Sequence, residues 1–281
     1  MRKINNVILN GAANRPFALD VFFTENNVQK PIIIFAHGFK GFKDWGHWSA
    51  IGEAFAEAGF VFVKFNFSHN GVTIEKSLDF ADLEAFGQNN YMKEFVDIGV
   101  VTDWLFEQKE IPETEIDLKK ITTIGHSRGG PIAILKALRD ERITSVITWA
   151  SVHQLDYWHN DQLIEQWRKD GVWNILNGRT QQQMPLYFQL YENFMENKDW
   201  LDVQVALTQL NKPMLIQHGS DDPAVSIFAA EQLHSWKKDA QLHIIEGANH
   251  VFGGSHPFTD SQLPEHSQIL VNQCIQFLRA L

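Results

Sequence analysis

Cysteine is nearly absent from this chain of 281 residues, in which Cys274 is the single example. One cysteine excludes an internal disulfide and any metal cluster built on several thiolates. Cys274 lies in the apolar pattern of the last expected helix, so we expect a buried packing residue. Long apolar runs are missing as well, since no stretch approaches the roughly 20 residues of a membrane-spanning helix.

Positive charge is also scarce, because 24 lysines and arginines face 34 aspartates and glutamates, for a formal net charge of −10. A field of this sign repels nucleic acid and anionic lipid surfaces. We therefore expect neither nucleic acid nor a membrane as a partner. The segment MRKINNVILNGAANRPFALD, residues 1–20, has no apolar run long enough for the core of a signal peptide, which predicts a cytoplasmic protein.

The sequence also lacks the motifs of common cofactor sites. It contains no His-Glu-x-x-His pair and no cluster of histidine and cysteine at ligand spacing, so we expect no metal. The glycine-rich stretch GFKGFKDWG, residues 38–46, lacks the pattern of a phosphate-binding loop. We expect Lys40 and Lys43 to be solvated loop charges, and we expect no cofactor.

The chain is rich in apolar and aromatic residues. It has 44% hydrophobic residues, among them 21 phenylalanines and 9 tryptophans. At 281 residues the chain is long enough for one large domain with a deep core, or for a core domain that carries an insertion. Apolar runs and helical periodicity alternate along it, which predicts an α/β fold with a mostly parallel central sheet and helices on both faces. The expected strands are 7–9, 17–23, 31–36, 60–67, 120–124, 143–149, 213–217 and 242–245. The expected helices are 47–58, 91–107, 131–139, 224–237 and 264–281.

This alternation stops within 152–208, a segment rich in tryptophan and tyrosine that contains no clear strand. We interpret it as a mostly helical cap inserted between two parts of the core, 1–151 and 209–281. Most of its tryptophans should pack, although a lid would present some of them to a substrate. His69, His153 and His159 could face the pocket, but a satisfied or exposed histidine is favoured at each position.

The segment ITTIGHSRGGPIAI, residues 121–134, joins a β-branched strand to an apolar helix, and Ser127 stands at the join. Such a turn directs the side chain away from the sheet and aims the free N–H groups of the helix at a bound group. Gly125 and Gly129 provide the small neighbours that the turn requires. This is the pattern of a nucleophile elbow, G-x-S-x-G. A helix-capping role for Ser127 is the structural alternative.

A serine nucleophile needs an imidazole to take its proton and a carboxylate to orient that imidazole. The segment HGSDDPAV, residues 218–225, ends one expected strand, and GANHVF, residues 247–252, follows the next. Candidates for the acid and the base therefore lie at the ends of neighbouring strands. The order Ser127, Asp222, His250 is the order expected for this elbow. Asp221 is the alternative acid.

With these three motifs the chain resembles the α/β-hydrolase superfamily over essentially its whole length. The resemblance implies Asp222 as the acid, because HGSDDPAV is similar to the His-Gly-x-x-Asp-Pro-x-Val segment of that family. Two N–H donors should stabilise a tetrahedral oxyanion. One is the backbone N–H of Arg128, directly after the nucleophile. FAHGFKGFKDWGHW, residues 35–48, resembles the His-Gly oxyanion loop and implies the N–H of Phe39 as the other.

The pair HGFKGFKDW and GHSRGG is similar to bacterial carboxylesterases of the dienelactone-hydrolase-like and cinnamoyl-esterase-like kind. This resemblance implies a serine hydrolase that cleaves a small-molecule ester through an acyl-enzyme intermediate. Ser127 stands where dienelactone hydrolases carry cysteine, which argues against that particular activity. Two alternatives stay open: a peptidase or amidase with the same triad, and a ligand-binding protein without catalysis. A homodimer is possible.

Overall fold

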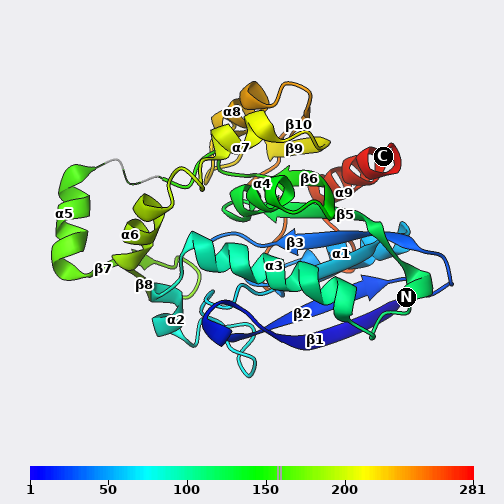
Figure 1. Ribbon diagram of the computed structural model, residues 1–281, viewed down its shortest axis with the longest axis horizontal. Coiled ribbons are helices and arrows are strands. Elements are labelled where there is room, and N and C mark those ends of the chain that lie inside the picture. Colours follow the sequence, from blue (N-terminus) through cyan, green and yellow to red (C-terminus); the bar gives the residue numbers. More distant parts are fainter. Residues whose placement is uncertain (157, 159) are drawn as a thin grey trace.

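An eight-stranded sheet forms the centre of the computed structural model, which describes residues 1–156, 158 and 160–281 (Figure 1). The strand order is β1-β2-β4-β3-β5-β6-β9-β10. β2 pairs in antiparallel fashion with β1 and with β4, and the other pairs are parallel. The strands are β1 (Arg2–Asn10), β2 (Pro16–Phe23), β3 (Lys30–Ala36), β4 (Val61–Phe65), β5 (Ile116–His126), β6 (Ile143–Trp149), β9 (Met214–Gly219) and β10 (Gln241–Ile245).

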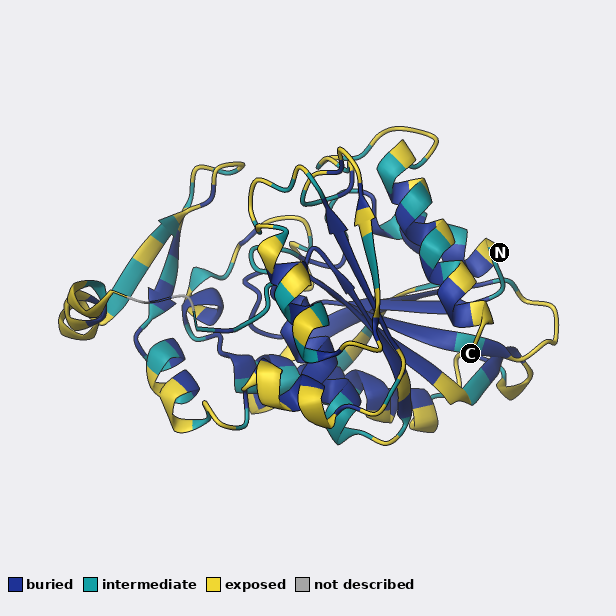
Figure 2. Ribbon diagram, turned by 90° about the horizontal axis from the view of Figure 1, so that it is seen from above, coloured by how far each residue is buried: buried dark blue, intermediate teal, exposed yellow. Residues whose placement is uncertain are grey.

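Helices cover both faces of this sheet, and Figure 2 shows the buried strands between them. α1 (Trp48–Glu57) and α9 (Glu265–Arg279) pack on one face, and α3 (Tyr91–Glu107), α4 (Gly129–Arg139) and α8 (Phe228–Trp236) on the other. In β3, Ile32 and Ile34 face one layer while Ile33 and Phe35 face the other. A strand between two helix layers must be apolar on both faces, which explains the continuous run. The predicted fold class is confirmed.

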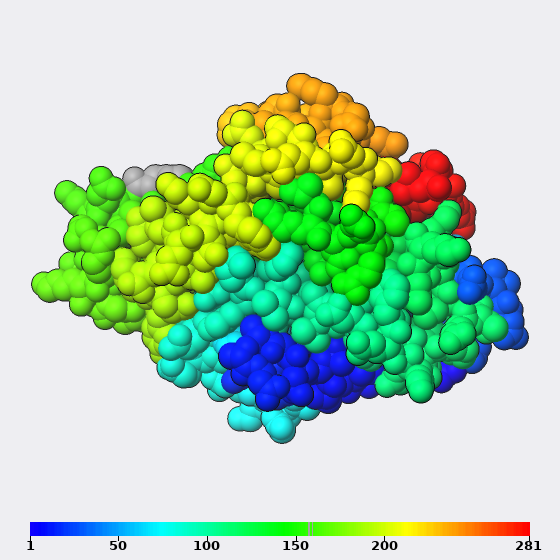
Figure 3. Space-filling view, in the orientation of Figure 1, coloured from blue at the N-terminus to red at the C-terminus, as the bar shows by residue number. Residues whose placement is uncertain are grey.

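Between β6 and β9 the structure departs from the expectation of a segment without strands. It contains α5 (Asp161–Asp170), β7 (Val172–Leu176), β8 (Gln183–Tyr187), α6 (Gln189–Glu196) and α7 (Val203–Gln209). β7 and β8 form an antiparallel hairpin in which Asn174 pairs with Pro185. Both strands have only five residues, and β8 contains Pro185, so neither gives a clear strand signal in the sequence. Figures 1 and 3 show α5 and the hairpin at one end of the molecule.

The tryptophans of this segment pack against one another. The ring centroids of Trp158 and Trp167 lie 5.6 Å apart, and those of Trp167 and Trp173 lie 5.7 Å apart. Trp167 also donates its Nε1–H to the carbonyl oxygen of Leu186 in β8, at 2.7 Å. The hairpin, α5 and α6 therefore share aromatic packing, and this packing is continuous with the main core through Tyr91 of α3, whose ring centroid lies 6.4 Å from that of Trp158.

Lys43 is buried, which corrects the expectation of a solvated loop charge. Its side chain is 2% exposed, and its Nζ lies 2.7 Å from Asp20 Oδ2 and 2.7 Å from Asp44 Oδ2. The fully buried Lys64 contacts the same two carboxylates. Two buried ammonium groups require partners of opposite charge, and the carboxylates of Asp20 and Asp44 are those partners. The loop after β3 is thereby attached to β2 and β4.

No helix in the described ranges combines the length and hydropathy required to cross a bilayer.

Candidate active site

Ser127 lies in the turn between β5 and α4 with a backbone φ of +53°. Residues other than glycine rarely adopt this left-handed region, and such strain is concentrated at functional sites. A Cβ on Gly125 would lie 2.2 Å from the carbonyl oxygen of Gly129, and one on Gly129 would lie 2.4 Å from that of Ala36. The turn therefore requires both glycines of the G-x-S-x-G pattern.

Asp222 and His250 follow the adjacent parallel strands β9 and β10, so their loops meet at the carboxyl edge of the sheet. His250 Nδ1 lies 2.7 Å from Asp222 Oδ2. The other carboxylate oxygen, Oδ1, accepts hydrogen bonds from the backbone N–H groups of Ala224, at 2.8 Å, and Val225, at 2.9 Å. The structure thus joins the predicted acid to the predicted base.

The environment of Asp222 keeps its carboxylate charged. Burial by itself raises the pKa of this group, whose side chain is 1% exposed. Hydrogen bonds from His218 and His250 outweigh burial and hold the pKa of Asp222 well below its usual range. Asp221, the alternative acid, is exposed and accepts a hydrogen bond from Ser220 Oγ at 2.9 Å. The carboxylate that contacts His250 is that of Asp222.

Ser127 and His250 line the same cavity, which has a volume of about 230 Å³. No hydrogen bond joins these two side chains within the described part of the chain. Hydrogen bonds of catalytic groups are often long before a substrate binds, so the shared cavity is the relevant observation. The other lining residues are His37, Gly38, Phe39, Lys40, Gly41, Trp45, Trp48, His126, Asn177, Arg179 and Val251.

The loop after β3 brings its backbone against Ser127. A Cβ on Gly38 would lie 2.8 Å from the Cβ of Ser127, so only glycine allows this approach. His37 holds the loop with Nδ1 bonded to the carbonyl oxygen of Gly38 at 2.9 Å and Nε2 accepting from Phe67 N–H at 3.2 Å. Burial lowers the pKa of His37 to about 4, so its ring is neutral and serves as an anchor. Arg128 N-caps α4 on the other side of Ser127.

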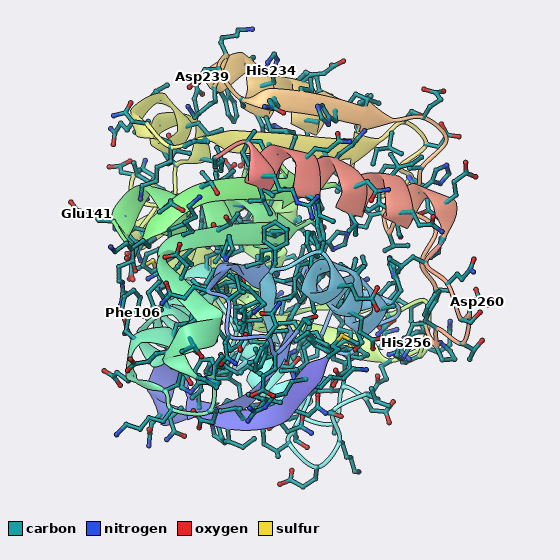
Figure 4. The ribbon with its side chains drawn as sticks, turned by 90° about the vertical axis from the view of Figure 1, so that its right-hand side faces the viewer. Phe106, Glu141, His234, Asp239, His256 and Asp260 are labelled. Carbon is teal, nitrogen blue, oxygen red and sulfur yellow. The ribbon has the colours of Figure 1, made fainter. Side chains whose placement is uncertain are left out.

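The segment before α9 also holds the loop after β3 in place. His256 Nδ1 accepts the backbone N–H of Gly46 at 2.8 Å. Its ring stacks on Trp45 with centroids 5.9 Å apart and meets Phe42 edge-on at 5.3 Å. Figure 4 shows His256 near Asp260, on the opposite side of the molecule from Phe106. The loop is therefore fixed by aromatic packing as well as by the buried charges around Lys43.

His126 contacts the segment of the predicted base, His250. Its Nε2 lies 2.9 Å from the carbonyl oxygen of His250, and the two rings are 4.8 Å apart. A carbonyl oxygen only accepts, so Nε2 of His126 carries the proton. Burial lowers the pKa of His126 to about 3, which keeps the ring neutral. His126 positions the segment of His250 without carrying charge.

Asn177 and Arg179 were not found by sequence reasoning. Both lie in the turn between β7 and β8 and line the cavity of Ser127. Lys40 and Arg179 supply positive charge, and no carboxylate is among the described lining residues. No motif in the sequence indicates that this turn reaches the cavity of Ser127. Its placement depends on how the cap is arranged in the folded protein.

The aromatic wall of the cavity also differs from the expectation. Trp45 and Trp48 provide it, and none of the described tryptophans of 152–208 lines this cavity, because three of them pack against one another and Trp200 packs on Phe95 of α3. His153 lines a separate cavity of about 520 Å³ that lacks Ser127. His69 is buried with Nδ1 2.8 Å from Ser68 Oγ. His159 lies outside the described residues.

The described residues include no group of three or more His, Cys, Asp or Glu side chains placed to hold a metal ion. Cys274 is buried, and burial raises its thiol pKa above the usual range. Its Sγ lies 2.8 Å from Gln217 Oε1, on the face covered by α9. The thiol is therefore a packing residue.

A family model described as "Prolyl oligopeptidase family" matches residues 47–272, the segment that contains Ser127, Asp222 and His250. The chain belongs to the prolyl oligopeptidase family. This membership confirms the prediction of a serine hydrolase with the α/β-hydrolase fold. In this member of the family, the turn of the β7–β8 hairpin contributes Asn177 and Arg179 to the cavity of Ser127.

Three further proteins are similar to this member of the family. "Putative esterase/lipase 2" of Mycoplasma pneumoniae (strain ATCC 29342 / M129 / Subtype 1) is 24% identical over 239 residues, which cover 77% of this chain and 81% of that protein. The structure of Est1E from Butyrivibrio proteoclasticus has a TM-score of 0.69 at 17% identity, over 99% of this chain and 98% of that one. An esterase domain from a Rhodothermus marinus protein has a TM-score of 0.66 at 16% identity, over 100% and 99%.

Proposed function

We propose that this protein hydrolyses carboxylic esters of small or medium size through an acyl-enzyme intermediate. One observation carries the proposal: the buried carboxylate of Asp222 is bonded to His250, and His250 lines one cavity with the strained Ser127. Three groups of this kind in this order are what nucleophilic catalysis by serine requires. The names of the relatives favour an ester over other acyl compounds.

In the first half of the proposed reaction, Ser127 Oγ attacks the ester carbonyl carbon while His250 Nε2 takes the hydroxyl proton. The backbone N–H groups of Phe39 and Arg128 donate hydrogen bonds to the oxyanion that forms. The bond to the alcohol oxygen then breaks, and His250 returns its proton to that oxygen. Asp222 stays ionised and stabilises the imidazolium from the Nδ1 side.

In the second half, a water molecule takes the place of the alcohol. His250 removes its proton as the water oxygen attacks the acyl carbon, and the same two N–H groups stabilise the second oxyanion. The bond to Ser127 Oγ breaks, the proton returns to that oxygen, and the free acid leaves. The cycle uses only groups of this chain and water.

The cavity suggests which esters fit. Trp45 and Trp48 give it aromatic walls, whereas Lys40 and Arg179 make it positive in a chain of net charge −10. We expect a preference for aromatic acyl groups, and for substrates that carry a carboxylate besides the ester. Est1E, which shares the fold, has been solved with ferulic acid bound, an aromatic acid of the expected size.

The test is a set of initial rates on p-nitrophenyl esters of increasing acyl length, on methyl cinnamates and on aminoacyl p-nitroanilides. The expected result is rapid ester turnover that Ser127→Ala abolishes, with unchanged thermal unfolding of the variant. Ester turnover that survives in Ser127→Ala contradicts the assignment of the nucleophile. A wild-type protein that hydrolyses none of these substrates would favour a ligand-binding role.

Peptide or amide hydrolysis is the second candidate, and the matched family description favours it. The same three side chains perform both reactions, so the leaving group decides between them. Turnover confined to the aminoacyl p-nitroanilides would identify a peptidase. Ester turnover that exceeds anilide turnover by several orders of magnitude would identify an esterase.

A further inference from the structure

Arg128 carries a buried charge that the proposed mechanism does not use. Its Nη2 lies 2.6 Å from Glu94 Oε1, and the two side chains are 9% and 3% exposed. The guanidinium lies over the ring of Phe39, 4.4 Å from the centroid, and 5.7 Å from the centroid of Tyr91. A buried ion pair is costly to desolvate and demands good geometry, so its position here needs an explanation.

The residues at the two ends of this contact are the two proposed donors to the oxyanion. The backbone N–H groups of Phe39 and Arg128 belong to different loops of the chain, one after β3 and the other after β5. The stack of the Arg128 guanidinium on the Phe39 ring links these loops directly. Donors of an oxyanion hole are effective because they are fixed before charge develops. A link between their side chains supplies this fixation.

Glu94 connects this link to the helix layer. It lies in the first turn of α3, and Asn89 donates its Nδ2–H to Glu94 Oε1 at 2.7 Å. Gln189 of α6 in turn donates to the backbone carbonyl of Asn89 at 2.8 Å. Glu94 Oε1 therefore accepts hydrogen bonds from two side chains, those of Arg128 and Asn89. Neither Glu94 nor the helix around it lines the cavity of Ser127.

We propose that Glu94 is a positioning residue of the oxyanion hole. Through its ion pair it fixes the Arg128 guanidinium, and through the stack on Phe39 it holds both N–H donors in one arrangement. This inference rests on the proposed function, because it assumes that the reaction passes through an oxyanion. It predicts that loss of the Glu94 charge weakens binding of the transition state more than binding of the substrate.

The first variant is Glu94→Gln, which keeps the shape of the side chain and removes its charge. We expect kcat to fall by roughly 10- to 100-fold, less than the loss of a whole donor, while KM changes by less than about twofold. Affinity for a phenylboronic acid, measured by calorimetry, should fall in parallel, because its tetrahedral adduct with Ser127 places an oxygen in the hole. Arg128→Lys should also lower kcat with little change in KM, because lysine keeps the charge but lacks the planar guanidinium that stacks on Phe39.

The matched control is Glu115→Gln, which breaks the buried pair of Lys30 and Glu115, whose side chains are 3% and 0% exposed. It should lower the melting temperature without changing kcat below that temperature. Equal falls of kcat in the Glu94 and Glu115 variants would overturn the positioning role, as would a rise of KM alone in Glu94→Gln. Wild-type protein that neither hydrolyses the panel nor binds the boronic acid would refute the proposed function and this inference with it. An active wild type whose rate is insensitive to Glu94→Gln would refute only the inference.

Discussion

Replacement of Asp222 by asparagine tests the predicted triad at its most defined contact. The carboxylate uses its two oxygens differently, because Oδ1 accepts the backbone N–H groups of Ala224 and Val225 while Oδ2 faces His250 Nδ1 at 2.7 Å. Asparagine has one oxygen, and the two backbone donors require it at the Oδ1 position. The amide NH₂ must then face His250.

This orientation decides the state of the base. An NH₂ group opposite Nδ1 requires Nδ1 to be an acceptor, so the proton of the neutral ring moves to Nε2. Nε2 can then no longer take the proton of Ser127. By the behaviour of other serine triads we expect kcat to fall by about 10³- to 10⁴-fold, equivalent to about 4 to 5.5 kcal/mol of transition-state stabilisation.

The matched control is Asp221→Asn, one position earlier. That side chain is exposed and bonded only to Ser220 Oγ in the described structure, so its replacement should change kcat by less than about threefold. The assay is p-nitrophenyl ester hydrolysis, with circular dichroism to verify that both variants fold. Similar losses in the two variants, or a larger loss in Asp221→Asn, would refute the reasoning from the Asp222 contacts.

Three further predictions concern the elbow, stability and specificity. Gly125→Ala should abolish activity and cost more than about 2 kcal/mol in the free energy of unfolding, because the added Cβ would lie 2.2 Å from a carbonyl oxygen. Gly178→Ala, with no atom within 4 Å of the added Cβ, should leave both unchanged. Burial raises the pKa of Asp97 from 3.8 to about 6. The folded chain therefore binds this proton more tightly than the unfolded chain. Its contribution to stability should be lost as the pH rises from about 4 to about 6, by at most roughly 3 kcal/mol. In urea unfolding, the advantage of the wild type over Asp97→Asn should then shrink between pH 4 and pH 7, and an advantage that grows would contradict this sign. Arg179→Gln should raise KM about fivefold, the equivalent of about 1 kcal/mol of screened attraction, for an aryl ester that bears a carboxylate. A matching rise for the neutral methyl ester would argue against charge recognition.

The central sheet could be predicted because its strands are buried on both faces. A continuous apolar run such as Ile32 to Phe35 is typical of a strand covered on both sides. The positions of Ser127, Asp222 and His250 could be predicted for a related reason. Each follows a parallel strand, and the carboxyl ends of such strands meet at one edge. Order along the chain and strand context were therefore sufficient to bring Ser127 and His250 to one edge, whereas the choice of Asp222 over Asp221 needed the resemblance of HGSDDPAV to the family segment.

The remaining features depend on contacts between distant parts of the chain. Lys43 looks like a solvated loop residue until Asp20, 23 positions earlier, is known to face it. The two strands of the β7–β8 hairpin have five residues each, and β8 contains a proline, so the sequence does not distinguish them from a loop. Arg179 is a turn residue whose presence in the cavity follows from the placement of that hairpin. None of these features has a periodic signal in the sequence.

The hairpin turn has a consequence for how selectivity could change in this protein. Asn177 and Arg179 contribute side chains to the cavity, but they lie in the turn of the β7–β8 hairpin, outside the eight-stranded sheet. Ser127, Asp222 and His250 are supported instead by the eight-stranded sheet. Substitutions in the turn can therefore alter which acid or alcohol is accepted while the reacting groups keep their geometry. For directed evolution, the exposed Arg179 is therefore a better starting position than Asn177, which is buried and whose side chain accepts the backbone N–H of Arg179.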